Sequence, residues 1–241
     1  MKINIFLALS FFIILISCVS REEERLFSKL SNKESGIYFS NDLSYDDDFN
    51  IFTYRNYFNG GGVGVIDINN DNLLDIYLTS NLNSNKLYLN LGDMKFKDIT
   101  DEAGVGGTKS WSTGVSIADV NADGFLDIYV CNSGDIEGDN KQNELFINNG
   151  DQTFTEMAKE FGLDDMGFST HAAFFDYDKD GDLDCYLLNN TIKSIGVGLD
   201  MVKGLRDVSS DQGNKLLRND NGYFTDVSSS SGIYTSDIGF G

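Results

Sequence analysis

The sequence predicts an all-β fold: a β-propeller whose blades each hold four antiparallel strands, with calcium loops between the first and second strand. A nine-residue acidic phrase occurs three times between short apolar runs, beginning at Asp67, Asp119 and Asp176. The period is therefore 52 and then 57 residues. Each period contains four short runs that suit strands and no convincing amphipathic helix, which is typical of a propeller blade.

The acidic phrases have the composition of calcium loops. Positions 1, 3, 5 and 9 are always Asp or Asn, and the position-7 carbonyl is expected to complete the set, because Ca²⁺ takes about 6 to 8 oxygen ligands. We therefore predict three structural Ca²⁺ sites. The predicted ligands are Asp67, Asn69, Asp71, Leu73 and Asp75; Asp119, Asn121, Asp123, Phe125 and Asp127; and Asp176, Asp178, Asp180, Asp182 and Asp184.

EF-hand loops and ordinary turns share part of this composition. An EF-hand loop closes with Glu at position 12, but Leu78, Val130 and Leu187 stand there and strand-like runs flank each loop. Ordinary turns are also rich in Asp, Asn and Gly. Three copies in register, with five carboxylates crowded into the third copy, favour metal binding, because uncompensated carboxylates repel one another.

Position 6 of each loop is expected to have a positive φ. Gly124 and Gly181 adopt such a backbone without a Cβ penalty. The first loop has Asn72, the non-glycine residue that best tolerates this region. We expect the first loop to close with some strain and to bind calcium most weakly.

A second phrase completes each repeat. Alternating apolar residues flank Asn90–Gly92, Asn148–Gly150 and Asn219–Gly222, a pattern that indicates hairpins. The predicted repeats span about residues 59–110, 111–167 and 168–233, within a propeller segment of residues 36–241.

Three repeats do not close a ring, because propellers use about four to eight blades. We interpret 234–241 as the start of a fourth repeat and the chain as the N-terminal part of a longer or interrupted protein. Residues 36–62 are interpreted as the closing strand of the last blade, and the insertion 189–213 is expected to form a short helix.

The N-terminus predicts export. Residues 1–17 combine a charged head with a short apolar run, as in a signal peptide. The run ends in Leu-Ile-Ser-Cys, which resembles the lipobox of bacterial lipoproteins and makes Cys18 the lipidation site. Residues 18–35 would be a tether. The predicted location is the outer membrane or cell surface, with membrane contact only through the lipid anchor; an ordinary secretory signal is the alternative.

The composition narrows the class of partner. The formal net charge of −20 argues against nucleic acid, which requires basic patches. Three Ca²⁺ ions would offset six of these charges. The other two cysteines, Cys131 and Cys185, are expected on opposite faces at different strand depths, buried and not disulfide-bonded.

The loops, the Asn-x-Gly turns and the Phe-x-Asp-Ile/Val phrases resemble the FG-GAP/VCBS repeat family, whose propellers occur in integrin α-subunits. Residues 59–69 and 169–178 are similar to bacterial lipoproteins of the ASPIC/UnbV type, which are related to cartilage acidic protein. The resemblance covers about residues 36–241. It implies calcium loops and extracellular binding or adhesion; Asn72 in place of Gly departs from the pattern.

Function is less specified than fold, because propellers host both binders and enzymes. The leading hypothesis is a non-enzymatic surface module that binds a protein or carbohydrate partner. An enzyme acting on polysaccharide is the alternative, with His171 as base and Trp111 and Phe168 stacking on sugar. In the competing interpretation His171 is hydrogen-bonded inside its blade and the aromatics cap the core. An accessory role beside an outer-membrane uptake system is a third possibility.

Overall fold

The computed structural model describes residues 26–47, 50–54, 56–109, 111–134, 140–190 and 213–233. The chain divides into two compact units, residues 1–31 and 32–241. The described part of the first unit, 26–31, contains no helix or strand. The predicted signal peptide, Cys18, the expected helix in the insertion and the start of a fourth repeat lie outside the described residues.

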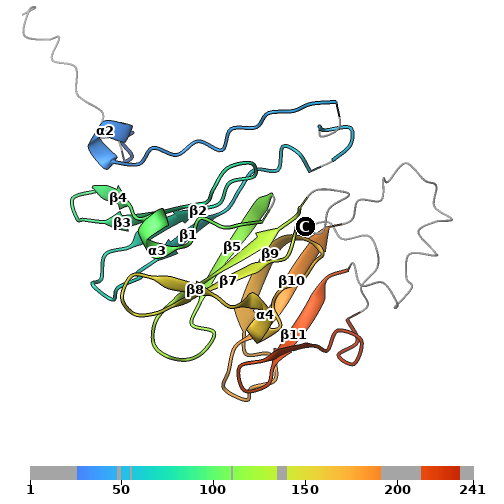
Figure 1. The fold of residues 1–241 in the computed structure, drawn as a ribbon. Helices are drawn as coiled ribbons and strands as arrows, with labels where there is room; N and C mark the ends of the chain where they lie inside the picture. The colour runs from blue at the N-terminus through green and yellow to red at the C-terminus, as the bar shows by residue number, and fades with distance from the viewer. Residues whose placement is uncertain are drawn as a thin grey trace, which may run out of the picture. The chain divides into compact units, whose positions relative to one another are not determined.

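The second unit is all-β, with three four-stranded antiparallel sheets that form an open part of a propeller (Figure 1). Each sheet is a simple meander, so neighbours in sequence are neighbours in the sheet. The first sheet contains β1 (Val63–Ile66), β2 (Asp75–Leu78), β3 (Lys86–Asn90) and β4 (Phe96–Asp98). The second contains β5 (Ser112–Ala118), β6 (Asp127–Asn132), β7 (Glu144–Asn148) and β8 (Phe154–Glu156). The third contains β9 (Phe168–Phe175), β10 (Asp184–Asn190), β11 (Lys215–Asn219) and β12 (Phe224–Asp226).

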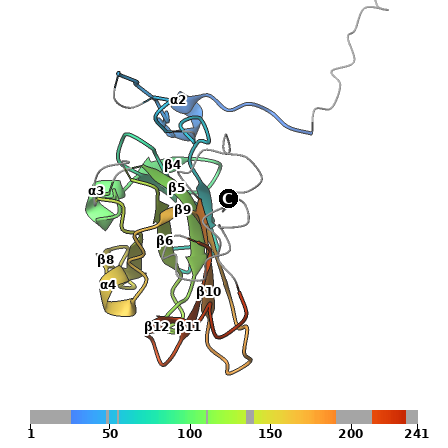
Figure 2. The same cartoon turned by 90° about the vertical axis from the view of Figure 1, so that its right-hand side faces the viewer.

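Among the described residues, helices are confined to single turns. The described part contains α2 (Asn32–Ser35), α3 (Thr100–Ala103) and α4 (Ala158–Phe161). Figure 2 shows α3 and α4 on the same side of the sheets. Each follows a fourth strand whose last acidic residue holds the helix start: Asp98 Oδ1 accepts from Thr100 N at 3.0 Å, and Glu156 Oε1 accepts from Ala158 N at 2.9 Å. No helix in the described ranges is long and apolar enough to cross a membrane.

Two apolar clusters join the sheets. The first lies between the first and second sheets and includes Ile66, Tyr77 and Leu87 with Val115 and Phe146. The second lies between the second and third sheets and includes Tyr129 and Leu145 with Leu187, Leu217 and Phe224. The second sheet has a neighbouring sheet on each of its two faces. Side chains that point to either face are therefore covered, and every residue of β6 and β7 is buried.

The innermost strands β1, β5 and β9 approach one another closely, with β5 between the other two. A Cβ added at Gly62 would lie 2.8 Å from the Thr113 carbonyl oxygen, and one at Gly114 would overlap the Thr170 carbonyl oxygen. His171 occupies the equivalent position in β9, where it is exposed.

Gly114→Ala is expected to lower the free energy of unfolding by about 3 kcal/mol, because the new methyl group can be accommodated only by moving backbone. Gly106→Ala is the matched control. Its added Cβ would meet nothing closer than 3.6 Å, so we expect a change below about 1 kcal/mol. Urea unfolding of both variants measures the difference. Equal midpoints would show that the close approach of β5 and β9 does not constrain the fold.

The predicted closing strand at residues 36–62 is wrong. The described residues before β1 form no strand, and residues 50–54 and 56–59 form local turns with bonds such as Tyr54 N to Asn50 O at 2.8 Å. Tyr54 and Tyr57 instead pack on Trp111, with ring centroids 5.3 and 5.1 Å away, and Phe168 joins the same cluster. The aromatic residues of this segment therefore act as a cap on the ends of β5 and β9.

The two buried cysteines are both free, as expected. They lie on opposite faces of equivalent strands, as predicted, and because those two faces pack against each other, both residues belong to the cluster between the second and third sheets. Cys131 faces the third sheet and Cys185 faces the second. Strand parity therefore gave the right face for each cysteine, but not that the two faces pack against each other.

Candidate metal-binding loops

Each acidic phrase forms the connection between the first and second strand of a sheet, as predicted. The loops span 67–74, 119–126 and 176–183, and the position-9 aspartates begin β2, β6 and β10. The predicted positive φ at position 6 is confirmed, at 67° for Asn72, 90° for Gly124 and 103° for Gly181. Position 4 also has a positive φ in every loop, which the sequence did not reveal: 57° for Asn70, 57° for Ala122 and 66° for Lys179.

The position-1 carboxylates point into their loops. Asp119 accepts hydrogen bonds from Asp123 N at 3.1 Å and from Gly124 N at 2.9 Å. Asp67 makes the equivalent bonds to Asp71 N at 3.1 Å and Asn72 N at 2.8 Å. Backbone donors thus fix the orientation of a carboxylate that retains further lone pairs for a cation.

Position 3 separates the third loop from the other two. Asn69 Nδ2 donates to Asp71 Oδ2 at 3.0 Å, and Asn121 Nδ2 donates to Asp123 Oδ2 at 2.8 Å. These amides partly satisfy the position-5 carboxylates inside the protein. Asp178 stands at the same place in the third loop, and its ionised form has no proton to donate.

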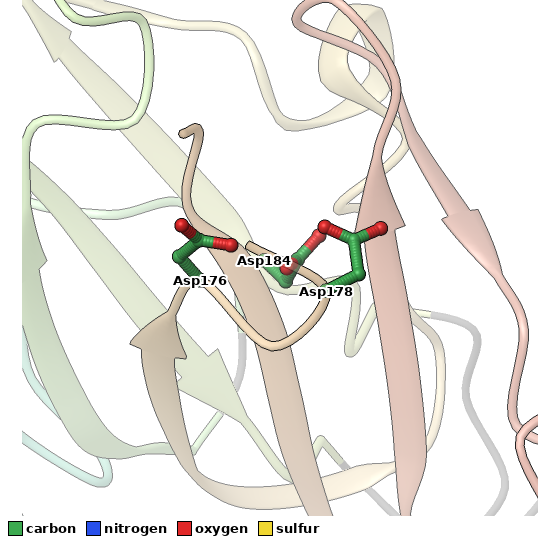
Figure 3. Close-up of side chains that lie close together, drawn as sticks. All are labelled: Asp176, Asp178 and Asp184. Carbon is green, nitrogen blue, oxygen red and sulfur yellow. The ribbon is translucent and has the colours of Figure 1, made fainter. Parts of the chain in front are cut away.

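Asp176, Asp178 and Asp184 bring three carboxylate oxygens within 4.8 Å of one another (Figure 3). Desolvation and repulsion from Asp180 and Asp184 raise the pKa of Asp178. Asp182 Oδ1 is buried without a hydrogen-bond donor among the described residues, and desolvation together with its acidic neighbours raises its pKa to about 6. The three carboxylates of Asp176, Asp178 and Asp184 could hold a metal ion. They fit a hard cation, because only oxygen ligands converge there.

The position-9 aspartates are the most buried charged groups of the loops, at most 1% exposed. Asp127 Oδ2 accepts from Val120 N and its Oδ1 accepts from Asn148 N, both at 2.9 Å. Asp75 and Asp184 make the same pairs of bonds in their sheets. Each of these carboxylates therefore joins its loop to the end of the third strand, a role that the ligand pattern alone did not predict.

The Asn of each Asn-x-Gly turn extends this connection. Asn148 Nδ2 donates to Leu126 O at 3.2 Å, and its Oδ1 accepts from Gly150 N at 2.9 Å. Asn90 and Asn219 make equivalent contacts with their own loops and turns. Asn148 Nδ2 also donates to Ile68 O of the first loop at 2.9 Å, so adjacent sheets are linked at this end.

A further set of asparagines was missed. The residue just before each third strand accepts from backbone at or just beyond the end of the second strand: Asn85 from Ser80 N at 2.9 Å, Asn143 from Asn132 N at 2.8 Å and Asn214 from Asn189 N at 3.0 Å. The signal was an Asn directly before each Lys/Glu-Leu pair of the repeat.

The two aromatic residues proposed to stack on sugar are buried. Trp111 and Phe168 are each 3% exposed, so they cap the core as the competing interpretation expected. His171 is exposed on β9 rather than enclosed within its blade, which corrects that part of the same interpretation.

Comparison with known proteins supports the repeat assignment. The model of the FG-GAP-like repeat matches residues 67–130 and 133–187, which begin in the first and second sheets. The chain contains FG-GAP-like repeats. It is also distantly homologous to cartilage acidic protein 1 of Xenopus tropicalis, with 29% identity over 163 residues. That match covers 66% of this chain and 23% of the relative. In each FG-GAP-like repeat the acidic loop is the connection from strand one to strand two.

Proposed function

We propose that the chain is a calcium-stabilised propeller module of an exported, surface-anchored lipoprotein and that it binds a protein or carbohydrate partner. The observation that carries this proposal is the convergence of the Asp176, Asp178 and Asp184 carboxylates. The same acidic phrase forms the equivalent loop of the other two sheets. A divalent ion would remove the repulsion among these carboxylates. It would also hold the loop in the strained backbone that places the second strand.

The proposed role of calcium is structural. All predicted ligands of each ion come from one continuous loop, so the ion would stiffen a connection between strands rather than join a substrate to a catalytic group. Asp75, Asp127 and Asp184 would take part both as ligands and as acceptors for backbone N–H groups. The first loop, with Asn72 at position 6, is proposed to bind most weakly and the third most tightly.

The proposal of a surface location rests on the lipobox-like residues that end at Cys18. A binding role is proposed because the loop carboxylates hold backbone N–H groups and the aromatics that would stack on sugar beside His171 are buried. Calcium at the millimolar level outside the cytoplasm suits loops of modest affinity.

Calorimetric titration of the full chain in detergent with Ca²⁺ tests the proposal. We expect three sites and a marked loss of affinity at the tightest site in Asp178→Asn, which gives the third loop the position-3 residue of the other two. The loss should be about tenfold, because one charged ligand becomes neutral. Glu160→Ala in α4 removes one exposed charge away from the loops and should leave the titration unchanged. Absence of calcium binding by the unmodified protein would refute the proposal.

A further inference from the structure

A half-open cavity of about 470 Å³, with both polar and apolar lining, lies at the end of the strands opposite the acidic loops. It is bounded by the β2–β3 connection, with Asn83 and Ser84, and by the segment between α3 and β5, with Thr108, Lys109 and Trp111. Because β1–β2 loops and β2–β3 loops leave an antiparallel meander at opposite ends, this cavity is remote from the candidate metal sites. Its volume is within the range of small-molecule sites.

The charge of the cavity is unlike that of the chain. The whole chain has 38 acidic residues against 18 Lys and Arg, yet among the described residues no Asp or Glu lines this cavity and Lys109 supplies its only charged side chain. In the same described part, a neighbouring cavity of about 460 Å³, which shares Trp111, is likewise lined without acidic residues. Lys109 has no ion-pair partner within the described ranges.

The walls of the cavity are held in place before any ligand arrives. Asn81 Nδ2 donates to Gly60 O at 3.1 Å and to Ser112 O at 2.9 Å, which ties the β2–β3 connection to β5. Thr108 N and Oγ1 donate to Glu144 Oε1 at 2.8 and 3.0 Å. The buried Glu144 also accepts from Asn132, so its charge is hydrogen-bonded behind the wall. A preformed wall reduces the ordering cost of binding.

Trp111 has a strained backbone at the boundary of both cavities. Its φ is 62°, a region that bulky residues rarely adopt. Its ring is fixed by an edge contact with Tyr54 and a tilted contact with Tyr57. Strain of this kind persists only where the surroundings enforce it, and it concentrates at ligand sites.

From these observations we propose that the cavity binds a saccharide that carries a carboxylate, such as a uronic acid. Lys109 pairs with the carboxylate, and the Asn83 amide, the Ser84 hydroxyl and the glycine backbone of the wall bind ring hydroxyls. The exposed Leu82 contacts the apolar face of the ring, beside the buried Trp111. This inference rests on the proposed binding function and deepens it by naming a ligand class and a place for it.

Trp111 is the only tryptophan in the chain, so its emission reports directly on this cavity. Titration of the full chain in detergent with a galacturonic acid disaccharide should shift the emission saturably. Galactose and lactose at the same concentrations should give a response at least about tenfold weaker in affinity, because the charge-assisted hydrogen bond is missing. An equal response to acidic and neutral sugars, or no response to either, would overturn the proposal.

Two variants locate the binding. Lys109→Met should weaken the acidic sugar about tenfold, and Asn83→Asp, which adds a carboxylate to the wall, should weaken it at least as much. Lys97→Met is the matched control, since Lys97 is an exposed lysine of β4 that pairs with Glu102. An unchanged affinity in Lys109→Met would contradict the site. Calcium titration is a separate readout, so failure of sugar binding with intact calcium binding removes this inference alone.

Discussion

Asp127→Ala is expected to lower the free energy of unfolding by about 3 kcal/mol, even in a calcium-free buffer. The Asp127 carboxylate is 1% exposed and accepts from Val120 N and Asn148 N. Its removal leaves two buried backbone N–H groups without acceptors, each at a cost of about 1–3 kcal/mol, and opens a small cavity. Chemical unfolding followed by tyrosine and tryptophan fluorescence measures the loss.

An opposing effect reduces but does not cancel this loss. Burial raises the pKa of Asp127 to about 6, so the ionised carboxylate has a desolvation cost at neutral pH that the alanine variant avoids. Two unpaired N–H groups remain in the variant at every pH. We therefore expect the cost of these unpaired groups to exceed the desolvation cost that the variant avoids. Asp123→Ala in the same loop is the control, because Asp123 is exposed and its calcium-free loss should stay below about 1 kcal/mol. Similar losses in both variants would show that the buried hydrogen bonds of Asp127 contribute no more to stability than those of an exposed residue of the same loop.

Repetition made the sheets and loops predictable from sequence. Three copies of one phrase fixed the period, and the period fixed which turn joins strand one to strand two. Asn72 could be placed in the left-handed region from its position in the phrase alone. The geometry of the loops was thus set by local residue types, which a single sequence displays directly.

The features that escaped prediction are contacts between distant segments. The position-9 carboxylate of Asp184 was recognisable as an oxygen donor, but its bond to Asn219 N joins residues 35 positions apart. Likewise, the aromatic run before β1 could be interpreted as a strand until its packing on Trp111 was known. Strand parity placed Cys131 and Cys185 on opposite faces, but their meeting in one cluster depends on how two sheets stack, which parity does not encode.

Each position-9 aspartate accepts one hydrogen bond from its loop and one from the end of the third strand. This pair of bonds, called the clamp below, connects the candidate metal loops to the packing of the sheets. Asp127 holds Asn148 N, and the Asn148 side chain donates both to Leu126 O of its own loop and to Ile68 O of the preceding one. A disordered first loop would therefore lose a hydrogen bond to the second sheet, as well as its own fold. Stabilisation by an ion in one loop should consequently extend beyond that loop.

Removal of calcium is expected to have the largest effect on the chain. One site saturated at about 100 times its dissociation constant adds about 2.7 kcal/mol to the free energy of unfolding, so three such sites would add about 8 kcal/mol. This is a large share of the total stability of a typical domain, about 5–15 kcal/mol. Unfolding in urea with millimolar Ca²⁺ and with excess chelator measures the difference.

The position-1 aspartates provide a variant that separates ion binding from the clamp. These residues, Asp67, Asp119 and Asp176, are at least partly exposed and accept hydrogen bonds from their own loops. Replacement of all three by Asn should abolish the stabilisation by calcium. The buried position-9 carboxylates stay in place in this variant. The triple variant in calcium should then unfold close to the midpoint of the unmodified protein in chelator. Stability that depends on bound calcium must disappear when the ion is withdrawn. If the unmodified protein has the same unfolding midpoint in calcium and in chelator, the acidic loops are therefore hydrogen-bonded turns that fold without an ion.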